Sequence, residues 1–136
     1  MKRNTNNEVY KIIDTTKIYK LASVLNIEGK DSTYLKEINT YFLKFYADGK
    51  VGEFFYYDDI NLNSLNPKRA TMGVYRYSKG ELIIQTYFRS PQGSGFIKER
   101  LKKHTADFLE FGSENYTCRY RKVDLPKEFL IYTPDW

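Results

Sequence analysis

The sequence contains one cysteine, one histidine and one tryptophan among its 136 residues. Cys118 alone excludes an internal disulfide and a thiolate metal cluster, and a lone cysteine is usually a small core residue. His104 alone excludes the paired-histidine spacing of zinc enzymes. No run of about 18 apolar residues occurs, so we expect no transmembrane segment. Residues 1–10 have basic side chains but no apolar stretch behind them. We therefore expect no secretory leader in this chain, and either a cytoplasmic protein or one whose leader has been removed.

Catalytic and metal-binding motifs are also scarce. The sequence offers one candidate catalytic triad with a cysteine nucleophile, made of Cys118, His104 and Asp107. Cys118 falls within a strand-like run, however, where neither a helix start nor a glycine elbow would activate its thiol. The stretch from Asp59 alternates Asp and Asn like a calcium loop, but Ser64 stands where such a loop needs glycine. We therefore predict a non-catalytic protein that uses no metal and no cofactor.

Aromatic residues, in contrast, are abundant. Thirteen tyrosines, nine phenylalanines and the tryptophan make up 17% of the chain, a composition that favours strands over helices. The 22 basic and 17 acidic residues are spread along the sequence, and the net charge of +5 gives a mild field that does not by itself indicate nucleic-acid binding. The length suits one domain. We expect a flexible N-terminal arm over residues 1–9 and a single folded domain over residues 10–136.

The clearest local signal is a hairpin in the first half of the chain. Two aromatic runs, residues 40–46 and 51–57, flank the pair Asp48-Gly49. Both residues tolerate positive φ, so the pattern predicts a β-hairpin. Residues 15–25 fit helical spacing as well as strand alternation, and we interpret them as a strand.

Two segments are predicted as loops. Residues 26–38 carry a Glu-Gly-Lys-Asp turn signal. Residues 58–70 form the longest predicted loop and are rich in Asp and Asn, which stabilise turns through their side chains.

Five further strand-like runs follow residue 70 with brief connectors between them, over residues 71–77, 81–89, 96–103, 107–111 and 116–123. With the earlier runs they make about eight strands in simple succession, and residues 128–133 form either one more strand or a segment packed outside. An open meander would leave two edges that invite aggregation, whereas closure removes them. We predict an all-β protein with a single eight-stranded, up-and-down antiparallel barrel. A two-sheet sandwich is the alternative.

The chain resembles the lipocalin-like, calycin-type small barrel proteins of the Bacteroidetes cell envelope. The resemblance rests on "YFLKFYADGKVG", on "NPKRATMGVYRYSKGELI" and on the closing "LPKEFLIYTPDW". It implies a lipocalin-like barrel and an exported, often lipid-anchored protein of the envelope or periplasm of a Gram-negative bacterium. The glycine-x-tryptophan of true lipocalins is missing, because the only tryptophan is Trp136, so retinol-type transport is not implied.

The run over residues 96–103 raises the question of which way its charged side chains face. If Phe96 points into the barrel, strict alternation brings Lys98 and Arg100 inside with it. Interior cations need water, a carboxylate or an anionic ligand, and the resemblance to fatty-acid carriers of the calycin group implies an interior arginine in that role. In the alternative phase Ile97 and Leu101 line the core and the cations face solvent.

These patterns predict that the barrel binds a small amphipathic or hydrophobic molecule, such as a lipid, in its interior. The candidate wall residues are Leu82, Ile84, Phe88, Phe96, Tyr116 and Tyr120, with Arg100 as the polar anchor. One alternative is an envelope scaffold with a filled barrel, whose exposed tyrosines and loop over residues 58–70 contact a protein partner. A second alternative, with less support, is single-stranded nucleic-acid binding on a basic aromatic face.

Overall fold

The computed structural model of the protein describes residues 7–26 and 41–136. Within these residues the strands are β1 (Lys17–Asn26), β2 (Phe42–Phe45), β3 (Lys50–Phe54), β4 (Thr71–Ser78), β5 (Glu81–Ser90), β6 (Gly93–His104), β7 (Phe108–Gly112) and β8 (Tyr116–Asp124). Short 3₁₀ turns are η1 (Asn7–Lys11), η4 (Ala47–Gly49), η5 (Leu62–Leu65), η6 (Pro67–Arg69) and η7 (Lys127–Ile131). In these residues no helix has the length and apolar character needed to cross a membrane. The loop predicted over residues 26–38 lies, from residue 27 on, outside the described residues.

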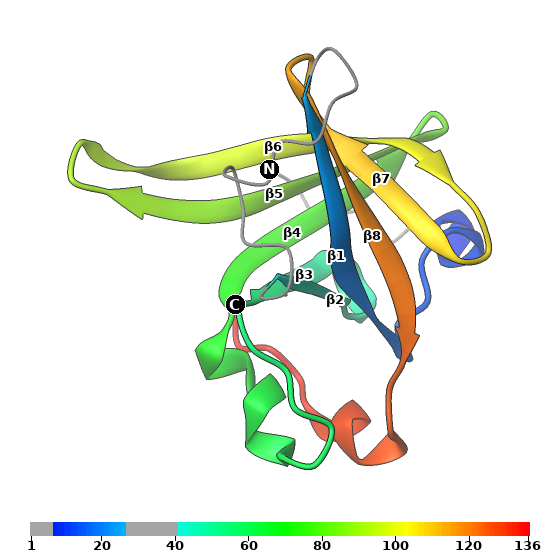
Figure 1. The fold of residues 1–136 in the computed structure, drawn as a ribbon, viewed down its shortest axis with the longest axis vertical. Coiled ribbons are helices and arrows are strands. Elements are labelled where there is room, and N and C mark those ends of the chain that lie inside the picture. The colour runs from blue at the N-terminus through cyan, green and yellow to red at the C-terminus, as the bar shows by residue number, and fades with distance from the viewer. Residues whose placement is uncertain (1–6, 27–40) are drawn as a thin grey trace.

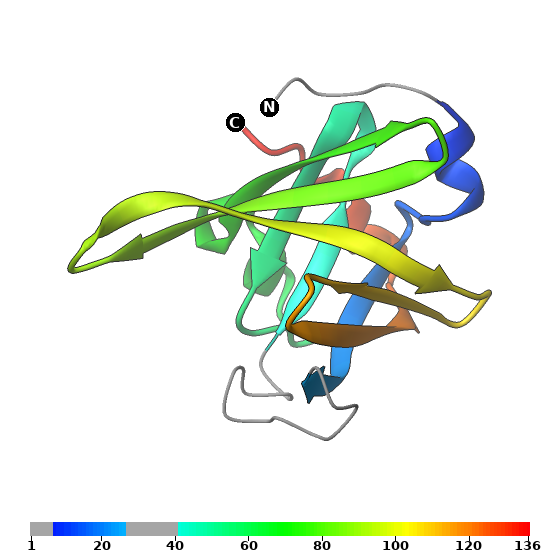
Figure 2. The same cartoon turned by 90° about the horizontal axis from the view of Figure 1, so that it is seen from above.

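The strands close into an antiparallel barrel in simple chain order (Figures 1 and 2). Each strand pairs with the next one along the chain, and β8 returns to pair with β1 over a long register that runs from Lys17↔Asp124 to Asn26↔Tyr116. The predicted eight-stranded, up-and-down barrel is confirmed, and the two-sheet alternative is not what forms. The closing pair removes the two free edges that an open meander would have left.

The predicted hairpin forms between β2 and β3. Phe45 pairs with Val51 at its end, and the turn η4 places Asp48 at φ 64° and Gly49 at φ 80°. Positive φ at two successive residues is what an Asp-Gly pair supplies at low steric cost. The turn therefore fixes the pairing register of β2 with β3, and with it which of their side chains face the barrel interior.

A bulge in β1 decides which of its side chains enter the barrel. The register with β8 shifts between Leu21 and Ser23, so that one extra residue, Ala22, stands in β1. Leu21 lies on the inner side before the shift and Val24 after it, and both are fully buried. Strict alternation cannot supply this spacing, because Leu21 and Val24 are three residues apart, a separation that also fits a helix.

Most of the barrel interior is filled by the protein's own side chains. The inner cluster is aromatic at its centre, where the Phe45 ring lies 5.5 Å from Tyr19, 5.6 Å from Tyr75 and 6.2 Å from Phe111, between ring centroids. These rings are fully buried. Space for a ligand inside the barrel is therefore found toward its end, away from this centre.

A second cluster covers the outside of β1, β2 and β3. All four residues of β2 are buried, because one face packs inside the barrel and the other packs under η5 and η7. The outer cluster comprises Ile18, Phe42, Phe54, Leu65, Leu125 and Phe129. Residues 128–133, predicted as a ninth strand or an outer segment, are the outer segment. The C-terminal segment and the 3₁₀ turns η5 and η6 lie together on one side of the barrel (Figure 1), so β2 is covered on both faces.

The hairpin of β5 and β6 extends beyond the barrel. The pairing of β4 with β5 ends at Thr86, and the pairing of β6 with β7 begins only at Arg100. Residues 87–96 therefore form a two-stranded arm that projects from one end of the barrel (Figure 2). We refer to that end of the barrel as the mouth.

Candidate functional site

Four of the seven predicted ligand residues lie in or against the inner cluster. Leu82, Ile84 and Tyr120 are fully buried there, and Tyr116 packs partly buried against it. Leu82, Ile84 and Tyr120 thus contribute to the filled centre of the barrel. Tyr116 stands nearer the mouth, at the start of β8.

The other three predicted residues lie outside the centre. Phe88 is exposed at the base of the arm, on the inner side of β5. Phe96 is half exposed on the opposite side of the arm, with its ring 5.8 Å from that of Tyr87. The Arg100 side chain is 64% exposed and its Nε lies 3.5 Å from the Glu81 carboxylate.

The register of β5 with β6 settles the direction of the charged side chains. Ile84, which is inside the barrel, pairs with Glu99, and directly opposed residues of an antiparallel pair share a face. Glu99 accordingly faces inward and is only 3% exposed, whereas Lys98 and Arg100 face outward. The phase that places Phe96 and Arg100 inside is therefore corrected to the alternative phase, with Ile97 and Leu101 on the inner side.

The mouth holds a pocket of about 520 Å³. It is lined by Tyr41, Glu53, Phe55, Thr71, Thr86, Tyr87, Phe88, Arg89, Ile97, Glu99 and Tyr116. Residues of β3, β4, β5, β6 and β8, together with Tyr41 just before β2, thus meet at one end of the barrel, beside the arm. Of the predicted residues, the structure brings Phe88 and Tyr116 together in this pocket.

A hydrogen bond anchors the floor of the pocket. The Tyr116 hydroxyl donates to the Glu99 carboxylate over 2.6 Å, a length typical of a hydroxyl bound to a carboxylate. Burying a carboxylate is costly unless it is hydrogen-bonded, so Tyr116 offsets part of the cost of placing Glu99 inside the barrel. The pair leaves the second carboxylate oxygen of Glu99 as an acceptor at the pocket.

A tight turn places Tyr116 opposite Glu99. Between β7 and β8 the Ser113 backbone N–H donates to the Tyr116 carbonyl over 3.1 Å. Gly112 makes this approach feasible, since a Cβ atom on it would lie 2.1 Å from the Tyr116 carbonyl oxygen. Tyr116 therefore begins β8 pointing inward, toward β6.

The pocket combines aromatic walls with carboxylates. Glu53 and Glu99 line it together with threonine and tyrosine hydroxyls, and Arg89 on the arm is the one cation among the described lining residues. Carboxylates beside aromatic faces attract a protonated amine or another hydrogen-bond donor. The interior charge is therefore opposite in sign to the one predicted from Arg100.

Sequence reasoning missed Glu53 and Glu99 as site residues. The signal for Glu99 was present in the alternation of β6, because a residue between Ile97 and Leu101 on that phase must face the same side as they do. The inward direction of Glu53 depends on its pairing with Leu43 of β2 and Thr71 of β4. A single sequence does not reveal this pairing.

Comparison of the chain with known protein families, with curated proteins and with solved structures found no match.

Proposed function

We propose that the mouth pocket binds a small amphipathic molecule whose apolar body lies against the aromatic wall and whose polar end is a protonated amine. The observation that carries the proposal is the inward carboxylate of Glu99, held by Tyr116 at the floor of a pocket of about 520 Å³. A volume of this order suits one small ligand. No catalytic step is part of the proposal.

Apolar burial would supply most of the affinity. Phe55, Phe88 and Ile97 are exposed although they line the pocket, and covering apolar surface gains about 25 cal/mol for each Å² removed from water. The carboxylates would orient the ligand with its charged end inward. The mechanism is capture and orientation, as the barrel resemblance implies, with a site opposite in charge to that of a fatty-acid carrier.

Calorimetry with three ligands of equal chain length tests this function. We expect the wild-type protein to bind decylamine more tightly than decanol, and decanol more tightly than decanoate. Glu99→Gln should remove the preference for the amine, while Glu128→Gln, on exposed η7, should keep it. If wild type and Glu99→Gln bind decylamine equally well, Glu99 does not recognise the amine. If wild type binds decanoate more tightly than decylamine, the site prefers an anion and the proposal is contradicted.

The closed barrel is compatible with the lipocalin-like resemblance, and that resemblance extends the proposal to the cell envelope as the place of action. Fractionation of the native cells tests this part by itself. Recovery of the protein with envelope or periplasmic fractions supports it, and recovery with cytosolic proteins contradicts it.

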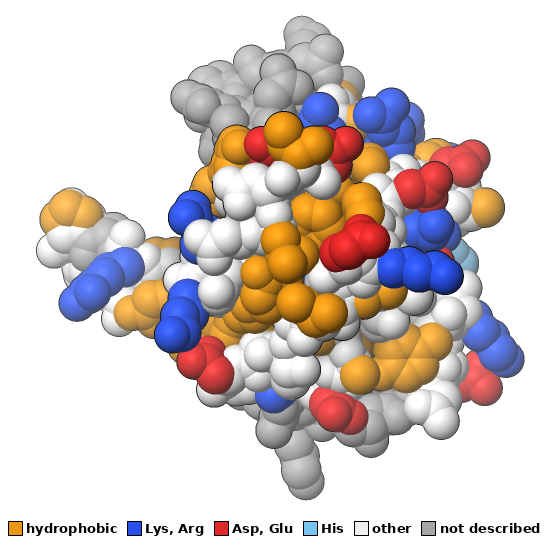
Figure 3. All heavy atoms as spheres, turned by 90° about the horizontal axis from the view of Figure 1, so that it is seen from below, with side chains coloured by type: hydrophobic (Ala, Val, Ile, Leu, Met, Phe, Trp, Pro, Cys, Tyr) orange, Lys and Arg blue, Asp and Glu red, His pale blue; other side chains and the backbone are white. Residues whose placement is uncertain are grey.

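A second candidate function is a scaffold that contacts a protein partner. An apolar patch remains exposed over η5 and η7, where Ile60 is 89% and Ile131 67% exposed and Leu62 and Leu130 lie at the surface. Figure 3 shows hydrophobic side chains gathered on the face formed by these segments, with charged side chains around them. Ile60→Asp together with Ile131→Asp should abolish recovery of a native partner by cross-linking while leaving decylamine binding intact. Unchanged cross-linking would remove the scaffold function.

A further inference from the structure

Lys44 is a buried lysine on the outer face of β2. The residue is 4% exposed, and its ammonium donates to the Thr15 carbonyl and, over 3.0 Å, to the Phe45 carbonyl. The Tyr46 ring lies 4.9 Å from the nitrogen. Among residues 7–26 and 41–136, no carboxylate forms an ion pair with Lys44. Its hydrogen-bond partners among these residues are therefore neutral carbonyl groups.

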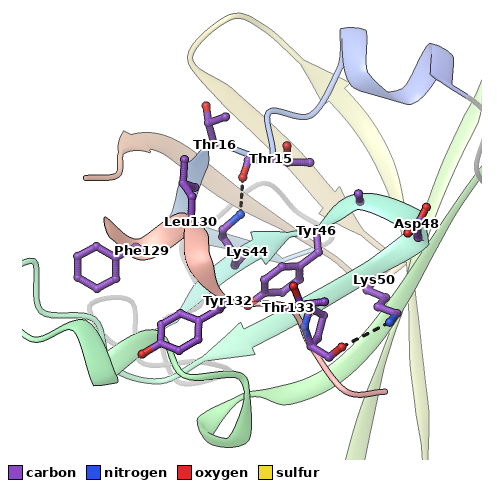
Figure 4. Close-up of a pocket in the computed structure, with 12 residues that line it drawn as sticks. Thr15, Thr16, Lys44, Tyr46, Asp48, Lys50, Phe129, Leu130, Tyr132 and Thr133 are labelled. Carbon is purple, nitrogen blue, oxygen red and sulfur yellow. Dashed lines mark hydrogen bonds between the residues drawn. The ribbon is translucent and has the colours of Figure 1, made fainter. Parts of the chain in front are cut away.

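A pocket of about 380 Å³ lies beside this lysine. It opens between the C-terminal segment, the turn η4 and the residues that lead into β1, outside the barrel and separate from the mouth. Figure 4 shows Lys44 reaching toward Thr15. The Lys50 ammonium donates to the Pro134 carbonyl over 3.4 Å. The two lysines line the pocket on opposite sides of Tyr46, and Lys44 is the buried one.

Donors predominate on the polar part of the pocket wall. Hydroxyl groups come from Thr15, Tyr46 and Thr133, in addition to the two lysine ammonium groups. The Thr16 hydroxyl donates to the Asp14 carboxylate, and the Tyr132 hydroxyl donates to the Leu62 carbonyl. The exposed carboxylate of Asp48 is the acidic group among the described lining residues. An ammonium has three N–H donors, and the two carbonyls take two of those of Lys44.

The electrostatics of Lys44 agree with this geometry. Burial lowers the pKa of Lys44 to about 8, against an opposing contribution from nearby Asp14. A buried cation without an ion-pair partner is costly, and an anion beside it would offset that cost. Five other charged or titratable groups lie around Lys44. They are Asp14 before β1, Tyr46 after β2, Asp48 in η4, Lys50 on β3 and Tyr132 after η7.

We propose that this pocket binds a small oxyanion, either a carboxylate or a phosphate, at the Lys44 ammonium, and that the positive charge of Lys50 on the other side of the pocket adds to the attraction. The remaining N–H of Lys44 and the hydroxyls of Thr15 and Thr133 donate to the anion, while Phe129 and Leu130 contact an organic substituent. This site is independent of the proposed ligand at the barrel mouth.

Titration with sodium sulfate, followed through threonine methyl signals in ¹H–¹³C spectra, tests the proposal. We expect a saturable shift of the Thr15, Thr16 and Thr133 methyls that sodium chloride at equal ionic strength does not produce. Acetate and phosphate in parallel titrations distinguish a carboxylate site from a phosphate site. Between pH 7 and pH 9 the sulfate affinity of wild type should fall about tenfold, as Lys44 loses its proton.

Three variants complete the test. Lys44→Met should abolish the sulfate shift and Lys50→Met should weaken it, whereas Lys68→Met, on exposed η6, should leave it unchanged. If Lys44→Met does not fold, Lys50→Met and the wild-type pH dependence decide the matter. The proposal is overturned if sulfate and chloride shift the same signals equally, or if both pocket variants bind sulfate like wild type.

Discussion

Tyr116 and Glu99 connect two strands that are not neighbours in the barrel. The hydroxyl of Tyr116 on β8 donates to the carboxylate of Glu99 on β6 over 2.6 Å, and the short strand β7 lies between them in the sheet order. The bond therefore spans β7 on the inner face of the barrel, near the mouth. It ties the floor of the proposed ligand pocket to the strand that continues into the arm.

Removal of this hydroxyl should destabilise the fold. In Tyr116→Phe the buried Glu99 carboxylate loses a donor, and we expect the free energy of unfolding to fall by about 1–3 kcal/mol. Urea denaturation measures the change. Tyr56→Phe is the matched control, because the Tyr56 hydroxyl bonds Asp58 at the exposed surface. An equal, small loss in both variants would mean that the Tyr116 bond contributes no more than a surface bond.

Gly112 should tolerate no side chain. A Cβ atom there would lie 2.1 Å from the Tyr116 carbonyl oxygen, which is backbone and cannot swing away. We expect Gly112→Ala to cost about 2–3 kcal/mol or more. Gly80→Ala should cost only about 1 kcal/mol, because that position has open space and a positive φ alone opposes the substitution. Similar midpoints of thermal unfolding for the two variants would contradict the close approach.

The outer cluster should behave as a second core. Phe129 is buried with its ring 5.4 Å from that of Tyr57, whereas the next residue, Leu130, is exposed. We expect Phe129→Ala to lower the free energy of unfolding by about 3–5 kcal/mol and Leu130→Ala to leave it nearly unchanged. Chemical denaturation of both variants is the measurement. A small effect of Phe129→Ala would show that the C-terminal segment lies on the barrel without stabilising it.

Lys44 should make stability depend on alkaline pH. Its folded-state pKa of about 8 lies below the ordinary value of 10.5, so the unfolded chain binds more protons between these limits and stability rises with pH there. Compared with Lys44→Met, wild type should gain on the order of 2 kcal/mol from pH 8 to pH 10.5. The comparison cancels the opposite contribution of Tyr19, whose burial raises its pKa to about 12. Parallel stability profiles would place the Lys44 pKa near its ordinary value.

The sequence was sufficient to predict the barrel but not the direction of every strand face. The Asp48-Gly49 turn follows from local steric rules, and the two residues have the positive φ that those rules require. The number and closure of the strands follow from short connectors and from the cost of free edges. Strict alternation does not predict the inward and outward faces of a strand that contains a bulge, such as the one at Ala22 in β1. A bulge shifts the phase of all residues after it.

The site was harder to predict because it depends on contacts between distant segments. Lys44 is the single charged residue in an aromatic and apolar run, and it is buried because the C-terminal segment covers the outer face of β2. The continuous apolar run around it was the available signal, since strands covered on both faces lose their alternation. In the case of Arg100, an assumed inward Phe96 set the wrong phase, and the extension of β5 and β6 into an arm explains how Phe96 can be exposed.

The most direct test of the ligand pocket is the position of a bound amine. Intermolecular NOEs between decylamine and the wild-type protein should connect the alkyl protons with the rings of Phe88 and Tyr116 at the mouth. NOEs to Ile60 and Ile131 alone, on the exposed patch over η5 and η7, would contradict a ligand site inside the barrel.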